Sequence, residues 1–391
     1  MSQGDIARHV KALLEAGNAG EAAVAAKALG TLAHDNDANC AAIADAGAIA
    51  PLVALVTNGT ADGQELAART LATLAGDEFD EHVSTRAAIV KAGGIPPLVA
   101  LVANPATRCQ EQAARALANL ADVRDDANHI AIAEAGAIAP LVALVANASA
   151  GGQEQAARAL ANLASGGTAI MGIAAAGAID PLVALVRNGA AGCQAPAARA
   201  LGVIAFYRYT RVAVPEAGIA PLVALVTNGS TDGKKWAAYA LQHLAYYDAN
   251  STAIVDAGGI SPLVALLRSA AQGQADAGCV DAGKNAAWAL GDIVSGNAAH
   301  QAAAVTAGAV DPLVALACRK APPFDRLKAA AKHALDKLNL TTKQWVATIA
   351  SRAQTLQAEN ESLKRRLFRM ASEELYSTEQ PPWRVKTPHP P

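Results

Sequence analysis

The apolar positions of this chain recur in long, regular blocks. The string AGAIAPLVALV returns with small changes along most of the sequence, so the chain is an array of repeats. A period close to 42 residues is too long for tetratricopeptide or ankyrin units and indicates a larger helical unit. One glycine in each copy marks the register: Gly47, Gly93, Gly136, Gly177, Gly218, Gly258 and Gly308.

Each copy has the pattern of three helices. A short apolar helix ends at the marker glycine, because glycine readily adopts the left-handed conformation that closes a helix. A second helix, PLVALV, has a proline just inside its start, where the missing N–H costs nothing. After a polar turn, a longer third helix places Ala67, Leu71 and Leu74 at core spacing in the first full copy. The prolines are Pro51, Pro97, Pro140, Pro181, Pro221, Pro262 and Pro312.

This order of glycine, proline, LVALV and QEQAARALANLA resembles the armadillo repeat of catenin-like and importin-like proteins. The resemblance covers roughly residues 5 to 340, as a partial unit without its first helix followed by seven full units. It implies an all-α, right-handed superhelical solenoid over 1–340. It also implies that the third helices line a concave groove that binds extended peptides.

Residues four apart on the third helices share one face, and this face predicts the groove lining. The predicted groove residues are Arg69, Arg115, Asn119, Arg158, Asn162, Arg199, Tyr239, His243, Trp288 and Asp292. The arginines of the first half favour an acidic peptide, since their planar groups suit carboxylates. The aromatic second half could take apolar or cationic side chains. Alternatively, Glu65, Glu111 and Glu154 form ordinary surface pairs with the arginines four residues later.

The residues on this face also distinguish importin-like from catenin-like proteins. Importin-like proteins carry a ladder of Trp and Asn for lysine-rich signals, whereas here Asn119 and Asn162 lack their tryptophans and arginines would repel a basic cargo. A catenin-like or vacuolar-scaffold-like adaptor is therefore favoured. A cargo receptor of nuclear transport and a substrate-recognition subunit of a ubiquitin ligase are the alternatives.

The composition and charge of the chain further limit the classes of partner that we expect. Lys and Arg number 32 against 34 acidic residues, so no global field directs the chain to nucleic acid. The five cysteines have no metal-ligand spacing, and no stretch has the roughly 20 apolar residues of a membrane span. We expect free thiols, a cytoplasmic or nuclear location, and no cofactor or metal.

Catalytic motifs are weak. The histidines are scattered, and His243, which we place on the groove face, is expected to be a solvated surface residue rather than a base. Gly278, Gly283 and Lys284 have the spacing of a phosphate-binding loop, but Asn285 replaces its Ser or Thr and no strand precedes it. We expect a flexible insertion there, a second insertion near residues 78–85, and no enzymatic activity. Phe206, Tyr207, Tyr209, Tyr246 and Tyr247 are expected to pack between units instead of lining the groove.

The pattern changes after residue 340. A four-heptad helix is predicted within 341–375, followed by a disordered proline-rich tail over 376–391. Its a and d positions predict a parallel two-stranded coiled coil and a homodimer, although the helix could instead cap the last repeat. The seam residues are Val346, Ile349, Ala353, Leu356, Asn360, Leu363, Leu367 and Met370.

Overall fold

The computed structural model describes residues 3–76, 82–104, 109–121, 126–211, 214, 216–272, 277–318 and 325–340, together with 357 and 361. In this part of the chain every regular element is a helix. The predicted coiled-coil seam and the proline-rich tail lie outside the described residues.

The helices follow the predicted plan of one partial unit and seven full repeats, which is confirmed. The partial unit is α1 (Gln3–Leu14) and α2 (Ala19–Ala33). Repeats one to three are α3 (Asp37–Asp45), α4 (Ile49–Asn58) and α5 (Ala61–Ala75); α6 (Val83–Lys91), α7 (Ile95–Ala103) and α8 (Gln110–Leu120); α9 (Asp126–Glu134), α10 (Ile138–Asn147) and α11 (Ala150–Ser165).

The last four repeats keep this order with one irregular first helix. They are α12 (Ile170–Ala175), α13 (Ile179–Asn188) and α14 (Ala191–Phe206); α15 (Arg208–Arg211), the 3-10 turn η1 (Glu216–Gly218), α16 (Ile219–Asn228) and α17 (Thr231–Leu244); α18 (Asp248–Asp256), α19 (Ile260–Ala271) and α20 (Ala277–Val294); α21 (Ala298–Thr306), α22 (Val310–Ala317) and α23 (Asp325–Lys337).

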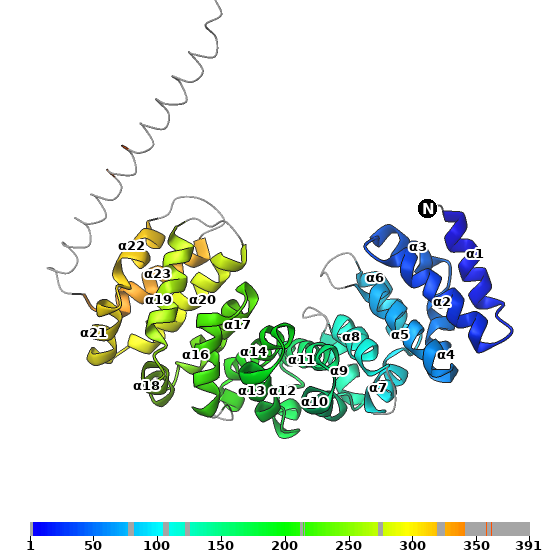
Figure 1. Ribbon diagram of the computed structural model, residues 1–391, viewed down its shortest axis with the longest axis horizontal. Coiled ribbons are helices and arrows are strands. Elements are labelled where there is room, and N and C mark those ends of the chain that lie inside the picture. Colours follow the sequence, from blue (N-terminus) through cyan, green and yellow to red (C-terminus); the bar gives the residue numbers. More distant parts are fainter. Residues whose placement is uncertain are drawn as a thin grey trace, which may run out of the picture.

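Together the repeats form an open arc (Figure 1). Each third helix packs against the third helices of the repeats before and after it, from α2 through α5, α8, α11, α14, α17 and α20 to α23. In the middle of the arc, α8, α11, α14 and α17 lie on the inner side, whereas α7, α10, α13 and α16 lie on the outer side (Figure 1). A continuous inner surface built from third helices is therefore available.

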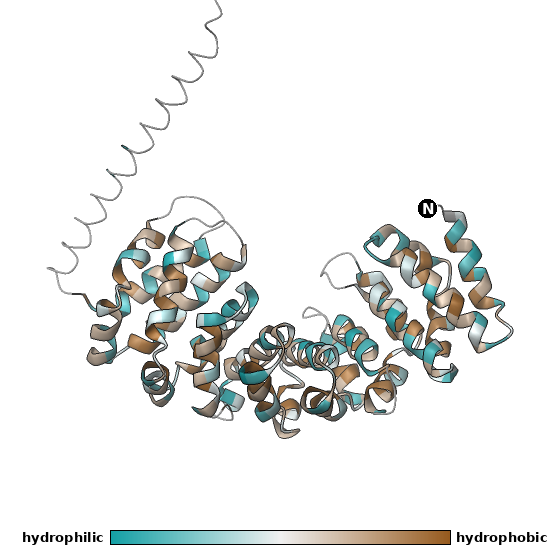
Figure 2. Cartoon of the chain, in the orientation of Figure 1, coloured by the Kyte–Doolittle hydropathy of each residue, from teal (hydrophilic) through white to brown (hydrophobic). Residues whose placement is uncertain are grey.

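The core is thin and made of small side chains. Apolar and polar residues alternate around individual helices, as amphipathic helices require (Figure 2). On the third helices, alanines such as Ala113 and Ala114 are fully buried beside a fully buried leucine, Leu117. The same arrangement returns at Ala156, Ala157 and Leu160. Alanine at these contacts lets neighbouring helix backbones approach closely.

The corner between the first and second helices follows the predicted chemistry at six of the seven marker glycines. These six have positive φ, between 73° and 84°. Gly218 is the exception, with φ −82°. In repeat five a short α15 and a 3-10 turn stand in place of the regular first helix.

The first helices have a further role that periodicity does not reveal: their polar residues cap the preceding third helix. Asn39 and Cys40 donate to the carbonyls of Leu32 and Ala33, at 2.7 and 3.3 Å. The equivalent pairs are Asn128 with Leu120, Arg211 with Ala205, Asn250 with Leu244, and Ser251 with Ala245. Each bond goes to a carbonyl in the last turn of a helix, where the regular helical N–H partners are missing.

The insertion in repeat six is helical where the structure describes it, so our expectation of a flexible loop is wrong there. It lengthens the third helix, α20, to 18 residues, and Gly278, Gly283 and Lys284 all lie within that helix. Gly283 and Lys284 lie beyond the first turn of α20, where backbone N–H groups bond within the helix and cannot cradle a phosphate. Of the extra residues near 78–85, residues 78–81 lie outside the described residues, and Val83 to Thr85 form the start of α6.

Within the described residues, no single helix is both long and apolar enough to cross a membrane. Four pairs of helices, each bent by 80° to 85° at a short break, meet the length and composition requirements together.

Candidate functional site

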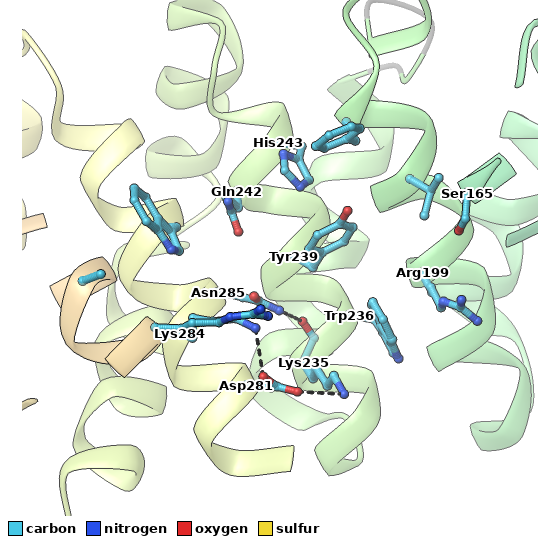
Figure 3. A pocket seen from close by; sticks show the side chains of 15 residues that line it. Ser165, Arg199, Lys235, Trp236, Tyr239, Gln242, His243, Asp281, Lys284 and Asn285 are labelled. Carbon is cyan, nitrogen blue, oxygen red and sulfur yellow. Dashed lines mark hydrogen bonds and ion pairs between the residues drawn. The ribbon is translucent and has the colours of Figure 1, made fainter. Parts of the chain in front are cut away.

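A cavity of about 630 Å³ opens on the inner surface in the C-terminal half of the arc. Its lining comes from five successive third helices, α11, α14, α17, α20 and α23. Side chains from α14, α17 and α20 converge on it (Figure 3). The lining residues are Ser165, Arg199, Val203, Phe206, Lys235, Trp236, Tyr239, Gln242, His243, Asp281, Lys284, Asn285, Trp288, Arg326 and Ala329.

Aromatic rings along α17 form one wall of the cavity. Trp236 and Tyr239 meet edge to face, with ring centroids 5.7 Å apart, and Tyr239 meets His243 in the same way at 4.4 Å. Gly202 on α14 makes room for this wall, since a Cβ there would lie 2.6 Å from the Tyr239 ring. Phe206 closes the wall against His243 at 5.1 Å. Our expectation that Phe206 stays out of the groove is wrong, because it lines the cavity and is half-exposed.

Cations surround the same wall. The Arg199 guanidinium lies over the Trp236 ring at 5.2 Å, and the Lys235 ammonium lies 5.0 Å from that ring. Burial lowers the pKa of Arg199, and the charge of Arg158 lowers it further, yet arginine stays protonated at neutral pH. The positive groups are therefore held in place by the aromatic surface before any ligand arrives.

Asp281 lies between two of these cations. Its carboxylate is 3.1 Å from Nζ of Lys235 and 2.9 Å from Nζ of Lys284, so it bridges α17 and α20 (Figure 3). Burial acts to raise the pKa of Asp281, but the two lysines outweigh it and the net pKa is lowered. Asn285 adds a second link by donating from Nδ2 to the carbonyl of Lys235 at 3.1 Å. Asp281 thus stays ionised at neutral pH and neutralises part of the local charge.

His243 differs from our expectation of a solvated residue. It is half-buried between Phe206 and Tyr239, and its Nε2 is buried with no hydrogen-bond partner among the described atoms. Burial, helped by the charge of Arg211, lowers its pKa to about 4. At neutral pH it is therefore an uncharged aromatic member of the wall. Burial also raises the pKa of Tyr239, which stays protonated.

The predicted groove residues of the first half are placed differently. Arg69, Arg115 and Arg158 are half-buried on α5, α8 and α11, on the same helical face as Arg199, but do not line this cavity. The carboxylates of Glu111 and Glu154 lie against Gly151 and Gly192, at the N-termini of the next third helices, where a negative charge is favourable.

Asn119 and Asn162 are not the exposed groove positions that the sequence indicated. They are 4% and 6% exposed. Asn119 donates to the carbonyl of Ala72, and Asn162 to that of Ala118, each at 2.8 Å. Asn119 also accepts a bond from Arg158. Both asparagines tie one third helix to the preceding one, and this packing buries them.

Trp288 and Asp292 meet a partner from the last repeat. The Trp288 ring lies 4.5 Å from that of His333 on α23, and Nε2 of His333 lies 3.5 Å from Asp292 Oδ1. Burial raises the pKa of Asp292, although His333 opposes the shift. His333 packs on Gly291, where a Cβ would come within 2.6 Å of its ring. The row of contacting side chains on the third helices therefore extends to α23, one repeat beyond the last groove residues predicted from the sequence.

Several cavity residues were missed from the sequence, although a signal for them exists. Lys235 and Trp236 precede Tyr239 by four and three residues, and Lys284 and Asn285 precede Trp288 by the same intervals. The i, i+3 and i, i+4 relations of a helix place these residues one turn earlier on the same face. Extending the groove face by one turn would have found them.

Comparison with known proteins settles the family. The family model for the armadillo/β-catenin-like repeat matches residues 83–122 and 125–165. A designed armadillo repeat protein solved in complex with the peptide (KR)4 is 30% identical, with a TM-score of 0.53, covering 63% of this chain and 99% of that one. The chain belongs to the armadillo-repeat family.

Two further structures extend this relation. An engineered protein from the Northeast Structural Genomics Consortium is 36% identical, with a TM-score of 0.73, and the match covers 86% of this chain and 79% of that one. A computationally designed armadillo repeat protein for modular peptide recognition is 28% identical, with a TM-score of 0.54, covering 63% and 100%. No curated protein sequence matches the chain. The armadillo resemblance read from the repeats is thus confirmed, and the architecture is that of an armadillo-repeat scaffold.

Proposed function

We propose that this armadillo-repeat chain is a non-enzymatic scaffold that holds an extended, acidic peptide segment of a partner protein in its inner groove. One observation carries the proposal: the third helices of consecutive repeats build a single cavity that combines an aromatic wall with fixed cations. Aromatic and arginine side chains are the types that dominate binding energy at protein interfaces.

The charges of the cavity favour an anionic ligand. Arg199, Lys235, Lys284 and Arg326 line it, against a single acidic residue, Asp281. His243 adds no charge at neutral pH, because its pKa is lowered to about 4 by burial and by Arg211. A basic peptide such as the (KR)4 bound by the designed relative would bring like charges together in this cavity. We therefore propose the opposite preference for this chain.

The spacing of the repeats sets the length of the ligand. Packed helices lie about 8–10 Å apart, whereas an extended chain advances about 3.3 Å per residue, so one repeat accommodates about three residues. Four of the five lining helices, α14 to α23, supply every lining residue except Ser165 and are separated by three intervals, which corresponds to about nine residues. Because side chains of an extended peptide alternate, an acidic residue followed by an aromatic one suits the cations and the aromatic wall in turn.

The first half of the groove supports the same preference. Arg69, Arg115 and Arg158 continue the face of Arg199 toward the N-terminus. We propose that they extend the binding surface to longer acidic segments. The heptad pattern at 346–370 supports a homodimer that would present two grooves and bind multivalent partners by avidity; those residues lie outside the described ones. A cytoplasmic or nuclear location is proposed with this function.

Peptides of matched length test the proposal. We expect the full-length chain to bind fluorescein-labelled (EY)4 at least about tenfold more tightly than (KY)4 or (KR)4 in fluorescence anisotropy titrations at 50 mM NaCl. The preference should shrink at 200 mM NaCl, because salt screens partly exposed charges.

Two matched arginine variants give the control. Arg199→Ala removes a cation of the cavity, whereas Arg8→Ala removes an exposed arginine on α1 that is paired with Asp5. Only the first should weaken binding of (EY)4. Equal binding of all three peptides, or equal effects of the two variants, would contradict the proposed groove.

A further inference from the structure

The charge and aromatic content of the cavity match a segment of this same chain. Residues 372–379 read SEELYSTE, with Glu373, Glu374 and Glu379 around Leu375 and Tyr376. This is the strongest acidic cluster after residue 340, a region that is otherwise basic through Lys364, Arg365, Arg366 and Arg369. The three carboxylates of this segment match the cations that line the cavity, and its leucine and tyrosine match the aromatic wall.

We propose that residues 372–379 occupy the cavity in cis and compete with external ligands. This inference rests on the proposed function of the groove and adds its regulation. Lys235, Lys284, Arg199 and Arg326 would face the glutamates, while the Trp236 and Tyr239 wall would face Tyr376. The excess of cations over Asp281 would then be neutralised when no partner is bound.

The path of the chain permits this contact. The cavity reaches α23, the last described helix, at Arg326 and Ala329. From Ala329 to Lys337, where α23 ends, the helix rises about 12 Å. The linker from residue 341 to residue 371 has a root-mean-square span of about 30 Å if it is flexible. The segment is therefore tethered at a distance that matches the cavity.

Docking in cis also restricts the direction in which the predicted coiled-coil helix can run. A helix over 346–370 that projected away from the solenoid would be about 38 Å long. Residues 371–376 could return over at most about 20 Å of that distance. Docking in cis and an outward-pointing coiled coil therefore exclude one another, and the helix would have to lie back along the solenoid.

The tether sets the size of the effect. A flexible tether gives an effective concentration on the order of 1 mM, so a segment with a Kd of about 0.1 mM would weaken an external ligand about tenfold. We expect E373Q/E374Q/E379Q in the full-length chain to bind (EY)4 about tenfold more tightly than the unaltered chain. The matched control is E359Q/E361Q, which neutralises two glutamates upstream of the segment and should leave binding of (EY)4 unchanged.

A photocrosslink tests the contact itself. Tyr376 is replaced by benzoylphenylalanine in the full-length chain, and crosslinked peptides are mapped by mass spectrometry after irradiation. We expect a product of monomer mass with crosslinks to α17 or α20, and its yield should fall severalfold in E373Q/E374Q/E379Q and not in E359Q/E361Q. Crosslinks outside the cavity, a product of dimer mass, or no crosslink would overturn docking in cis.

The two experiments separate this inference from the proposed function. If the triple variant and the unaltered chain bind (EY)4 equally well and no crosslink to the cavity forms, the inference fails while the groove function stands. If neither chain binds (EY)4, the proposed preference of the groove for external acidic peptides fails, and the crosslink still reports whether the segment docks.

Discussion

The two halves of the inner groove share one scaffold and differ in what projects from it. In both halves, third helices meet through buried alanines and leucines, such as Leu117 on α8 and Leu290 on α20. In the first half the projecting residues are Arg69, Arg115 and Arg158, and the asparagines beside them are buried between helices. In the second half, Trp236, Tyr239 and Trp288 project, and the cavity forms among them.

This difference shows how an armadillo-repeat solenoid can change its ligand without changing its fold. The core positions are occupied by the same residue types throughout, so the backbone path is maintained. Only the groove-facing positions of each third helix change, from arginine in the first half to aromatic residues with lysine in the second. Because each repeat contacts mainly its neighbours, such changes can accumulate in one half and leave the other half as it is.

The largest effect should separate the two halves by affinity. Trp288→Ala removes an aromatic member of the cavity, and we expect a loss of (EY)4 affinity of roughly 70-fold, or about 2.5 kcal/mol. Arg115→Ala in the first half should cost less than about threefold. Fluorescence anisotropy measures both, and circular dichroism checks that each variant is folded.

The variant Trp288→Phe is the control for a purely structural effect of Trp288→Ala. It keeps a ring against His333 and should retain a substantial part of the affinity that Trp288→Ala loses. If Arg115→Ala weakens binding as much as Trp288→Ala, the division of the groove into two unequal halves is wrong.

The second half should also carry a pH dependence of stability through His243. Its folded pKa of about 4 lies below the ordinary value of 6.5, since burial and Arg211 disfavour the proton. Above pH 6.5 the imidazole is neutral in both states and the stabilisation is complete. Between pH 6.5 and 4 the unfolded chain binds the proton first, so stability falls by on the order of 2 kcal/mol.

Urea unfolding at a series of pH values measures this change. His243→Phe keeps an aromatic ring in the wall and should flatten that part of the profile. His34→Gln alters a histidine that is 69% exposed, so it should leave the profile unchanged. An identical pH dependence in unaltered and His243→Phe chains would show that His243 does not carry it.

The sequence predicted the repeats well because their signals are local. A glycine at the corner, a proline at the third position of the second helix and a leucine-alanine pattern on the third helix each act within one unit. In repeat five the sequence has a proline, Pro215, within the first-helix pattern, and the described residues of that helix form only the short α15 and a 3-10 turn. The insertion was misread because its glycines favoured a loop, whereas packing against α17 and α23 keeps it helical.

The groove was predicted only in part because its lining depends on contacts between repeats. Arg199, Tyr239, His243 and Trp288, which the helical period placed on one face of the third helices, line the cavity. It could not show that Asn119 turns toward Ala72 on the previous third helix, since that bond joins positions 47 residues apart. Nor could it show that Asp281 bridges two lysines from different helices. These contacts depend on the distance between neighbouring repeats.

The smallest effect should sharpen the contrast within the first half, between Asn119 and Asn162. Both donate to a carbonyl of the preceding third helix, but only Asn119 also accepts a bond, from Arg158, whereas the Asn162 Oδ1 is buried with no hydrogen-bond partner among the described atoms. Asn119→Ala breaks two bonds, so it should lower the free energy of unfolding by about 1.5 kcal/mol. Asn162→Ala breaks one bond and removes a buried unpaired oxygen, so it should cost less, about 0.5 kcal/mol.

Urea unfolding compares both with Asn147→Ala, an exposed asparagine bonded only within its own helix. If Asn162→Ala proves the costlier change, the bond from Arg158 to Asn119 does not stabilise the solenoid.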